Sequence, residues 1–285
     1  MRKVMVIPNP TKDVNLKVTE AVINKLSSLG FTPCLERKYS VEGLSGVDCF
    51  DTPSDEYEFI IVIGGDGSVI DASLVAVELN IPLLGINLGK VGYLVEVDPA
   101  SFDKLDLLIS GKFDVEEKML LTVKKHSVDG EDEISDRFAV NDVVVSHDNY
   151  FGISDFMVEN QREDHVRFRA DGIIVSTPQG STAYSLSAGG PIISHTLDSI
   201  TVTPVCPHSF FNRAIVYGPE EKIKISNVSD SLVNVSIDGR LFTKLEHGDF
   251  CVVEKSNKRF KMITFGESNV FSTLSKKIKS IQDIL

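Results

Sequence analysis

The strongest constraint on the fold is a run of five apolar residues, 59–63, that changes abruptly into the turn Gly64-Gly65-Asp66-Gly67. Such a run indicates a strand covered on both faces, and the amphipathic segment 68–79 after it indicates a helix. The turn is therefore expected at the carboxyl end of a parallel strand. Ligands of open α/β sheets bind at such ends, where glycines let backbone N–H groups approach a phosphate closely.

Asp66 is the residue for which we predict a chemical role, because it is the only carboxylate in this turn. Phosphate repels a carboxylate, so we expect Asp66 to act on a hydroxyl group or a metal ion. A structural turn with Asp66 as a helix cap is the alternative. The turn is not a Walker A loop, because no Gly-Lys-Ser/Thr follows its glycines. It is not a dinucleotide fingerprint either, because Ile70 stands where the third glycine of that motif belongs. The residues expected to bind phosphate are Gly64, Gly65, Gly67 and Ser68.

Composition narrows the class of protein. The 285 residues, 42% of them hydrophobic, suffice for one large or two moderate domains. A net charge of −12 argues against nucleic acid or an anionic membrane as a partner, because both need basic surface. The four cysteines are widely spaced, which predicts neither a zinc site nor a disulfide framework. With no signal peptide and no spanning segment expected, the cytoplasm fits best.

The pattern of elements changes along the chain. Residues 4–7, 31–37, 59–63 and 82–87 read as strands, with helices at 14–29 and 68–79, which predicts a doubly wound α/β domain over residues 1–98. After one more helix at 102–109, short strands predict a β-rich domain over residues 99–269. The helical spacing of residues 273–285 predicts that the segment 270–285 packs back on the first domain.

The predicted strands of the second domain recur between turn residues. They are residues 119–125, 138–146, 173–177, 200–205, 222–225, 232–237, 250–253 and 260–265. The acidic stretch 129–136 is expected to be a solvated hairpin loop.

A second polar and glycine-rich constellation, residues 169–191, flanks one of these strands. Together with the first turn it resembles the NAD kinase family, and the resemblance extends over nearly the whole chain. The matching motifs are Gly64-Gly65-Asp66-Gly67, residues 85–90, Asn141-Asp142, residues 176–184 and residues 203–209.

The resemblance implies a fold and an activity. The fold is an N-terminal α/β domain, a C-terminal β-sandwich domain and a chain end that returns to the first domain, assembled as homodimers or homotetramers. The activity is transfer of the γ-phosphoryl group of ATP to the 2′-hydroxyl of the adenosine ribose of NAD, which gives NADP. Mg²⁺ or another divalent cation is expected to bridge the donor phosphates, and the sequence names no ligand for it.

The resemblance also implies roles for individual residues. Asp66 is the base that faces the 2′-hydroxyl, with Gly67 beside it. Asn141 and Asp142 stand where the family has an Asn-Glu pair at the adenosine end, and Asp142 is shorter than Glu by about one methylene. The other implied contacts are Thr182 and Tyr184 with the adenine, and Ala183, Ser187 and Asp171 with the nicotinamide end, Asp171 coming from the same chain or a neighbouring subunit.

Elementary chemistry agrees with several of these roles. Tyr184 can stack on a base through its ring face, and an Asn-Asp pair can bond an adenine edge or ribose hydroxyls. Arg169, counted among the NAD-binding residues, and Lys90 could add positive charge near phosphate, whereas solvated surface is the alternative for both.

Two other functions remain open at this point. A diacylglycerol or sphingoid lipid kinase resembles this chain in its glycine turn, but no basic or apolar membrane face is evident. A non-catalytic NAD-binding sensor would retain the pocket, but binding alone needs no base such as Asp66.

Overall fold

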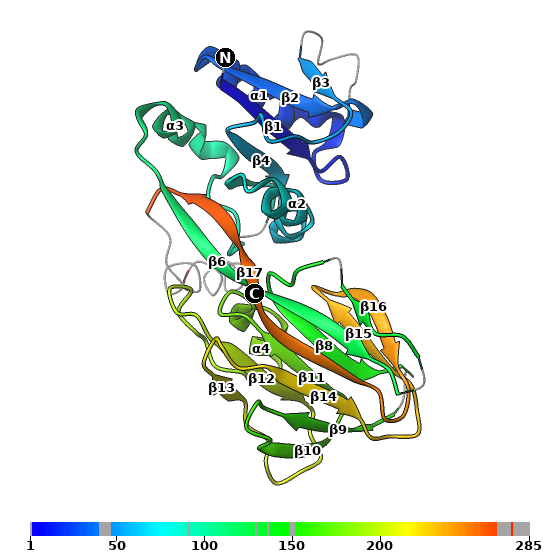
Figure 1. The fold of residues 1–285 in the computed structure, drawn as a ribbon. Helices are drawn as coiled ribbons and strands as arrows, with labels where there is room; N and C mark the ends of the chain where they lie inside the picture. Colours follow the sequence, from blue (N-terminus) through cyan, green and yellow to red (C-terminus); the bar gives the residue numbers. More distant parts are fainter. Residues whose placement is uncertain are drawn as a thin grey trace. The chain divides into compact units, whose positions relative to one another are not determined.

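The computed structural model describes residues 2–39, 47–89, 92–128, 130–135, 137–148, 152–266 and 275. The chain divides into two compact units (Figure 1), unit 1 with Met1–Glu117 and Phe260–Leu285, and unit 2 with Lys118–Arg259. The boundary falls inside two long strands, β6 (Asp114–His126) and β17 (Phe250–Thr264). The domain division at residues 98 and 99 stays a prediction. Residues 99–117 make their contacts in unit 1, because the helical segment that begins at Pro99 packs on the first helix.

Unit 1 contains a parallel sheet. Its strands are β1 (Arg2–Pro8), β2 (Phe31–Glu36), β3 (Asp48–Phe50), β4 (Phe59–Gly64) and β5 (Leu83–Asn87). They follow the order β3-β2-β1-β4-β5, and Met262 at the end of β17 pairs in parallel with Leu83. Every residue of β4 is buried, so this strand is covered on both faces as predicted. The doubly wound α/β fold is confirmed.

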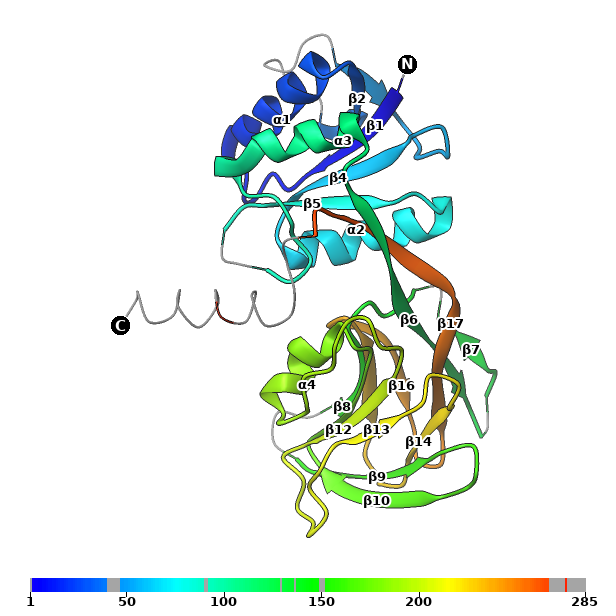
Figure 2. The same ribbon diagram turned by 90° about the vertical axis from the view of Figure 1, so that its left-hand side faces the viewer.

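Helices cover both faces of the parallel sheet. They are the 3₁₀ segments η1 (Val14–Leu16), η2 (Arg37–Tyr39) and η3 (Pro99–Asp106), and the α-helices α1 (Lys17–Ser28), α2 (Asp66–Leu79) and α3 (Leu107–Ser110). The connections β1-α1-β2 and β4-α2-β5 run in opposite directions along the sheet. Right-handed crossovers therefore place α1 and α2 on opposite faces, as Figure 2 shows.

The first predicted helix is interrupted near its start. Asn15 and Leu16 have φ angles of 58° and 52°, so α1 begins only at Lys17. The buried carboxylate of Asp13 accepts the backbone N–H of Thr19 at 2.8 Å and thereby satisfies one of the free donors of the first helical turn. The continuous helix predicted over residues 14–29 was wrong in this turn, because the capping contact is not visible in the hydrophobic spacing.

Unit 2 is built from antiparallel strands. They are β7 (Glu133–Ile134), β8 (Asp142–His147), β9 (Ser154–Glu159), β10 (His165–Ala170), β11 (Gly172–Ser176), β12 (Ile200–Val205), β13 (Ile215–Tyr217), β14 (Ile223–Asn227), β15 (Val233–Ile237) and β16 (Arg240–Leu245). One layer has the order β13-β12-β11-β8-β15-β16, and the other has β10-β9-β14-β17 with β6 beside β17. Two short helices, η4 (Gly180–Thr182) and α4 (Tyr184–Ser187), follow β11.

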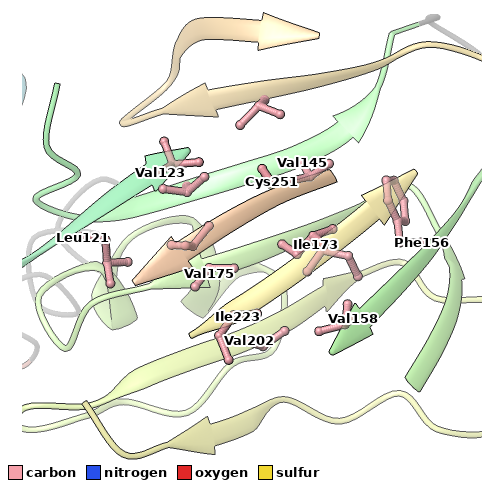
Figure 3. Close-up of a cluster of buried hydrophobic side chains, with 14 of the residues drawn as sticks. Leu121, Val123, Val145, Phe156, Val158, Ile173, Val175, Val202, Ile223 and Cys251 are labelled. Carbon is pink, nitrogen blue, oxygen red and sulfur yellow. The ribbon is translucent and has the colours of Figure 1, made fainter. Parts of the chain in front are cut away.

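The core of unit 2 lies between these two layers (Figure 3). Alternate residues of each strand point inward, such as Val143 and Val145 of β8 in one layer and Phe156 and Val158 of β9 in the other. Their side chains are at most 3% exposed. The predicted β-sandwich is confirmed.

Several predicted strands differ from the structure. Residues 250–253 and 260–265 belong to one strand, β17, because the polar residues between them stay in the ladder and do not form a turn. The strand predicted from residue 138 begins at Asp142. Short β3 and the strands β9, β10, β13 and β16 were not predicted, and short β7 lies within the stretch 129–136 that was expected to be a loop. The helix expected at 102–109 is mostly 3₁₀. The C-terminal helix predicted over residues 273–285 lies outside the described residues, apart from position 275.

None of the helices in the described part of the chain is long and apolar enough to span a membrane.

Candidate active site

The glycine turn of unit 1 is shared between a strand and a helix. Gly64 ends β4, Gly65 precedes α2, and Asp66 begins the helix, two residues earlier than predicted. None of the turn glycines has a positive φ, so they serve to leave space. A Cβ on Gly64 would collide with the Ser68 side chain, whereas a Cβ on Gly67 would meet nothing within 4 Å. The space beside Gly67 is therefore open for a ligand.

The Asp66 carboxylate is held by the segment that follows β5. Its two oxygens accept the backbone N–H groups of Tyr93 and Leu94, each at 3.0 Å. A Cβ on Gly92 would collide with the same carboxylate, so the segment approaches Asp66 as closely as a glycine allows. Each oxygen keeps a second lone pair, and the residue is partly exposed. Asp66 is thus fixed in orientation and can still accept a further hydrogen bond.

Asn9 links the ends of two neighbouring strands. Its backbone N–H donates to the carbonyl of Ile63 at 2.9 Å, and its side-chain Nδ2 donates to Ser68 Oγ at 2.8 Å. The order of the sheet reverses between β1 and β4, and open α/β sheets bind ligands in the crevice at such a point. The glycine turn therefore lies at the ligand-binding end of unit 1.

Lys12 is a candidate phosphate-binding residue that sequence reasoning missed. The Asn9 side-chain oxygen accepts the backbone N–H of Lys12 at 3.2 Å and holds the loop after β1. The ammonium of Lys12 lies 2.9 Å from the point where a Cβ on Gly65 would stand. A cation beside exposed backbone N–H groups favours a phosphate. The Pro8-Asn9-Pro10 sequence after the first strand was the available signal.

Unit 2 contains a pocket of about 380 Å³ that brings together four of the predicted site residues. They are Asn141, Asp142, Ala183 and Tyr184, accompanied by Val144, Ser146, Ser236, Asp238 and Gly239. The roles implied for these residues stay predictions. Tyr184 is 46% exposed, so its ring belongs to the surface of the unit and not to the core.

Thr177 and Gly180 position the backbone on which the pocket is built. The Thr177 hydroxyl donates to the carbonyl of Val140 at 2.6 Å, and its backbone N–H donates to the carbonyl of Asn141 at 2.9 Å. A Cβ on Gly180 would collide with the carbonyl of Asn141. This close approach fixes the segment that leads to Tyr184 against the start of β8.

Asp238 is a second residue that sequence reasoning missed. Its carboxylate accepts the backbone N–H groups of Val140, Asn141 and Asp142 at 2.8 to 3.0 Å. It occupies a two-residue hairpin turn with Gly239, in which both residues have positive φ, 47° and 77°. Asp-Gly between two strands is a strong hairpin signal and could have indicated the turn, though not its contacts.

The pocket is acidic, and one of its two carboxyl groups is buried. Asp142 is 5% exposed, and burial together with the charge of Asp238 raises its pKa to about 7. Burial also raises the pKa of Asp238, while the three backbone N–H groups oppose that rise. Near neutral pH, Asp142 therefore exists in both protonation states and can donate or accept a hydrogen bond.

The other predicted residues of unit 2 do not line this pocket. The Thr182 hydroxyl donates to the carbonyl of Gln179 at 3.1 Å, and Ser187 is exposed at the end of α4. Arg169 is exposed on β10. Asp171 is near enough to Tyr184 that its charge contributes, after burial and Cys206, to a raised tyrosine pKa.

The predicted cation Lys90 and the ligands of a divalent metal ion are not located by the structure. Lys90 lies outside the described residues. Within the described part of the chain, no group of three or more His, Cys, Asp or Glu residues could hold a metal ion. Mg²⁺ commonly takes one or two carboxylates and completes its shell with substrate phosphates and water.

Comparison with known proteins agrees with the geometry. The ATP-NAD kinase N-terminal domain matches residues 4–113, and the ATP-NAD kinase C-terminal domain matches residues 140–265. The NAD kinase of Caldanaerobacter subterraneus is 33% identical over 98% of this chain and 99% of its own. The chain belongs to the NAD kinase family. It is therefore an enzyme of the phosphotransferase class, with the fold of that family.

Further NAD kinases support the assignment. That of Thermoanaerobacter sp. is 34% identical over 98% of this chain and 99% of its own. The crystal structure of a yeast NADH kinase complexed with NADH has a TM-score of 0.83 at 22% identity, covering 98% of this chain and 88% of that one. An NAD kinase from Archaeoglobus fulgidus in complex with ATP has a TM-score of 0.71 at 24% identity, covering 97% and 99%. These two structures share the fold of this chain.

Proposed function

We propose that the chain transfers the γ-phosphoryl group of ATP to the 2′-hydroxyl of the adenosine ribose of NAD and releases NADP and ADP. One observation carries this proposal most directly. The glycine turn presents an oriented carboxylate, Asp66, and a cation, Lys12, at the ligand-binding end of the parallel sheet. Phosphoryl transfer to an alcohol needs this combination, because a base accepts the hydroxyl proton while positive charge stabilises the phosphoryl oxygens.

On the donor side, backbone N–H groups at the start of α2 and the Lys12 ammonium bind phosphate oxygens. The open space beside Gly67 lets the phosphate reach the backbone. Asp66 takes up the proton that leaves the attacking hydroxyl. Because Tyr93 and Leu94 fix both of its oxygens, little reorganisation is needed when the substrate arrives.

On the acceptor side, the pocket of unit 2 binds the adenosine of NAD. The ring of Tyr184 stacks on the adenine, and Asn141 with Asp142 bonds the adenosine. Asp238 keeps the backbone of both residues in place through its three hydrogen bonds. Thr182, Ala183, Ser187, Asp171 and Arg169 keep the roles that the family resemblance implies.

A divalent cation, Mg²⁺ or a substitute, belongs to the proposal. When bound, it would neutralise the charge that develops on the donor phosphates. Phosphates and water would supply most of its ligands, because the described residues hold no acidic cluster for it.

The proposal includes a cytoplasmic location and assembly into a homo-oligomer. Four free thiols suit a reducing cytoplasm. A homodimer or homotetramer is proposed from the family resemblance, and light scattering on the purified chain tests it.

A direct assay tests the proposed activity. The purified chain is incubated with ATP, Mg²⁺ and NAD, and a dehydrogenase that accepts NADP but not NAD reports 2′-phosphorylated product. Diacylglycerol and sphingosine serve as competing acceptors, and Asp66→Asn serves as the inactive control. NADP formation that depends on ATP is expected. Lipid phosphorylation without NADP, or NAD binding with no transfer at all, would contradict the proposal.

A further inference from the structure

One layer of unit 2 carries a row of polar side chains, of which the proposed function uses only Asp142. Ser176 of β11 lies directly opposite Asp142 of β8 on one side and opposite Thr201 of β12 on the other. Residues directly opposite each other in a sheet point to the same face. The neighbours Val143 and Val175 point into the core of the sandwich, so the polar row lies on the other face of the layer.

The segment that contains α4 packs on this outer face. Thr203, two residues after Thr201 and therefore on the same face, has its hydroxyl 3.0 Å from that of Ser185 in α4. A Cβ on Gly190 would collide with both of these side chains, so the segment approaches β12 as closely as a glycine allows. Ser176 and Thr201 are fully buried on this face.

The two buried hydroxyls of the row have no hydrogen-bond partner among the described residues. The hydroxyl of Ser199, which is buried and lies two positions before Thr201, also has no partner there. The contact between Thr203 and Ser185 shows that hydroxyls on this face bond each other directly where they are near enough. A buried hydroxyl without a partner is costly, so three of them close together in the fold point to a molecule that bridges them.

The Asp142 carboxyl at the end of the row is in the same situation. The backbone N–H of Asp142 donates to Asp238, but no group in the described part of the chain donates a hydrogen bond to the Asp142 side chain. Side chains directly opposite in a sheet have Cβ atoms about 4.5 to 5.5 Å apart. One water molecule with a hydrogen bond of about 2.8 Å on each side spans such a gap between Ser176 and Asp142.

We propose that ordered water bound by the Ser176 and Thr201 hydroxyls donates a hydrogen bond to the Asp142 carboxylate and holds it in position for NAD. The inference rests on the proposed function for the role of NAD and deepens it, because it adds two positioning residues behind the adenosine pocket. Water suits these groups better than a metal cation does. A cation would bind the hydroxyl oxygens and leave their protons unpaired, whereas water both donates and accepts.

The charges around Asp142 leave this task to hydrogen bonds. The ionisable groups that act on Asp142 or on its neighbours come from the turn between β15 and β16, from α4 and from the loops beside them; they are Asp238, Tyr184, Asp171, Cys206 and Arg137. Burial and the charge of Asp238 both disfavour ionisation of Asp142, and no cation among the described residues counteracts them at this carboxyl. A donated hydrogen bond would favour the ionised form.

Carbon-13 NMR of the full chain without ligand tests the proposed water site, because it follows the titration of the Asp142 carboxyl, whose signal Asp142→Asn identifies. Ser176→Ala and Thr201→Val each remove one hydroxyl, whereas Thr201→Ser keeps it. Ser154→Ala is the matched control, because the Ser154 hydroxyl is also buried without a partner among the described residues but lies on β9 in the other layer.

We expect Ser176→Ala to lower the acid dissociation constant of Asp142 by about three- to tenfold, because the ionised form loses a hydrogen bond. Thr201→Val should change it in the same direction. Thr201→Ser and Ser154→Ala should titrate as the wild type does. The inference is overturned if Ser176→Ala and Thr201→Val titrate as the wild type does, or if Ser154→Ala has as large an effect as they have.

Assays of NADP formation at pH 7 test the positioning role. Ser176→Ala should raise the KM for NAD by about three- to tenfold and leave kcat within about twofold, because Asp142 holds the substrate and takes no part in the transfer. The expected NMR pattern without any NADP formation would contradict only the proposed function. NADP formation with an unchanged titration of Asp142 in Ser176→Ala would contradict only this inference.

Discussion

The backbone N–H of Asp142 donates a 3.0 Å hydrogen bond to the carboxylate of Asp238, so the buried Asp142 and the half-buried Asp238 meet in one pocket. The hydrogen bond stabilises the charged form of Asp238, and the negative charge of Asp238 in turn disfavours ionisation of the Asp142 carboxyl. Burial and this repulsion raise the pKa of Asp142 to about 7. Because this carboxyl is partly protonated at neutral pH, the charge of the pocket changes with pH.

Asp142→Asn should stabilise the protein increasingly as pH rises from 5 to 8. The unfolded chain ionises Asp142 near pH 4, whereas the folded chain does so near 7. The folded state binds the extra proton between these values, so the stability that Asp142 contributes is lost as pH rises toward 7. Thermal unfolding of the wild type and Asp142→Asn at several pH values measures this.

Asp148→Asn is the control for this series. Asp148 is partly exposed and pairs with Lys244 at 2.9 Å, which lowers its pKa. Its effect on Tm should be constant between pH 5 and 8. A Tm difference for Asp142→Asn that is also independent of pH would show that Asp142 is fully ionised in the folded protein.

Gly67→Ala and Gly64→Ala should have opposite consequences. A methyl group on Gly67 meets no atom within 4 Å and favours the helix by up to about 1 kcal/mol, so Gly67→Ala should not lower Tm. Gly67→Ala should reduce the rate of NADP formation at least about tenfold, because a methyl group then stands where the phosphate approaches.

Gly64→Ala should lower the free energy of unfolding by about 1 to 3 kcal/mol, because its methyl group collides with Ser68. Calorimetry and the NADP assay on both variants test this, and full activity of Gly67→Ala would show that the open space holds no ligand.

Tyr184→Ala should weaken NAD binding by about 1 to 3 kcal/mol through lost stacking. Because the side chain is 46% exposed, the free energy of unfolding should change by only about 0.5 kcal/mol. Tyr184→Phe keeps the ring and should bind NAD almost normally. Titration calorimetry compares the three proteins. If Tyr184→Ala binds NAD as tightly as the wild type does, the Tyr184 ring is not part of the NAD site.

The parts of the fold that depend on local sequence pattern could be predicted from the sequence. The strand at residues 59–63 and the carboxylate after it were predicted because a buried strand, a glycine turn and a helix follow one another directly. Strand β17 was misread as two strands, since a polar stretch of strand that stays in the ladder has the composition of a turn.

The missed site residues depend on long-range contacts. Asp238 supports Asn141 across 97 positions of the chain, and no local pattern encodes that pairing. Lys12 reaches Gly65 only because Asn9 holds the loop after β1 against α2.

The central claim is that Asp66 accepts the proton of the 2′-hydroxyl of NAD. The most direct measurement is kcat for NADP formation by Asp66→Asn at saturating ATP and NAD. Asn has nearly the shape of Asp but is not a base, so we predict that kcat falls by about 10²- to 10⁴-fold. The KM for NAD should change by only a few-fold, since binding does not require the base. A kcat within about tenfold of the wild type would contradict the account and leave Asp66 as the residue that anchors Tyr93 and Leu94.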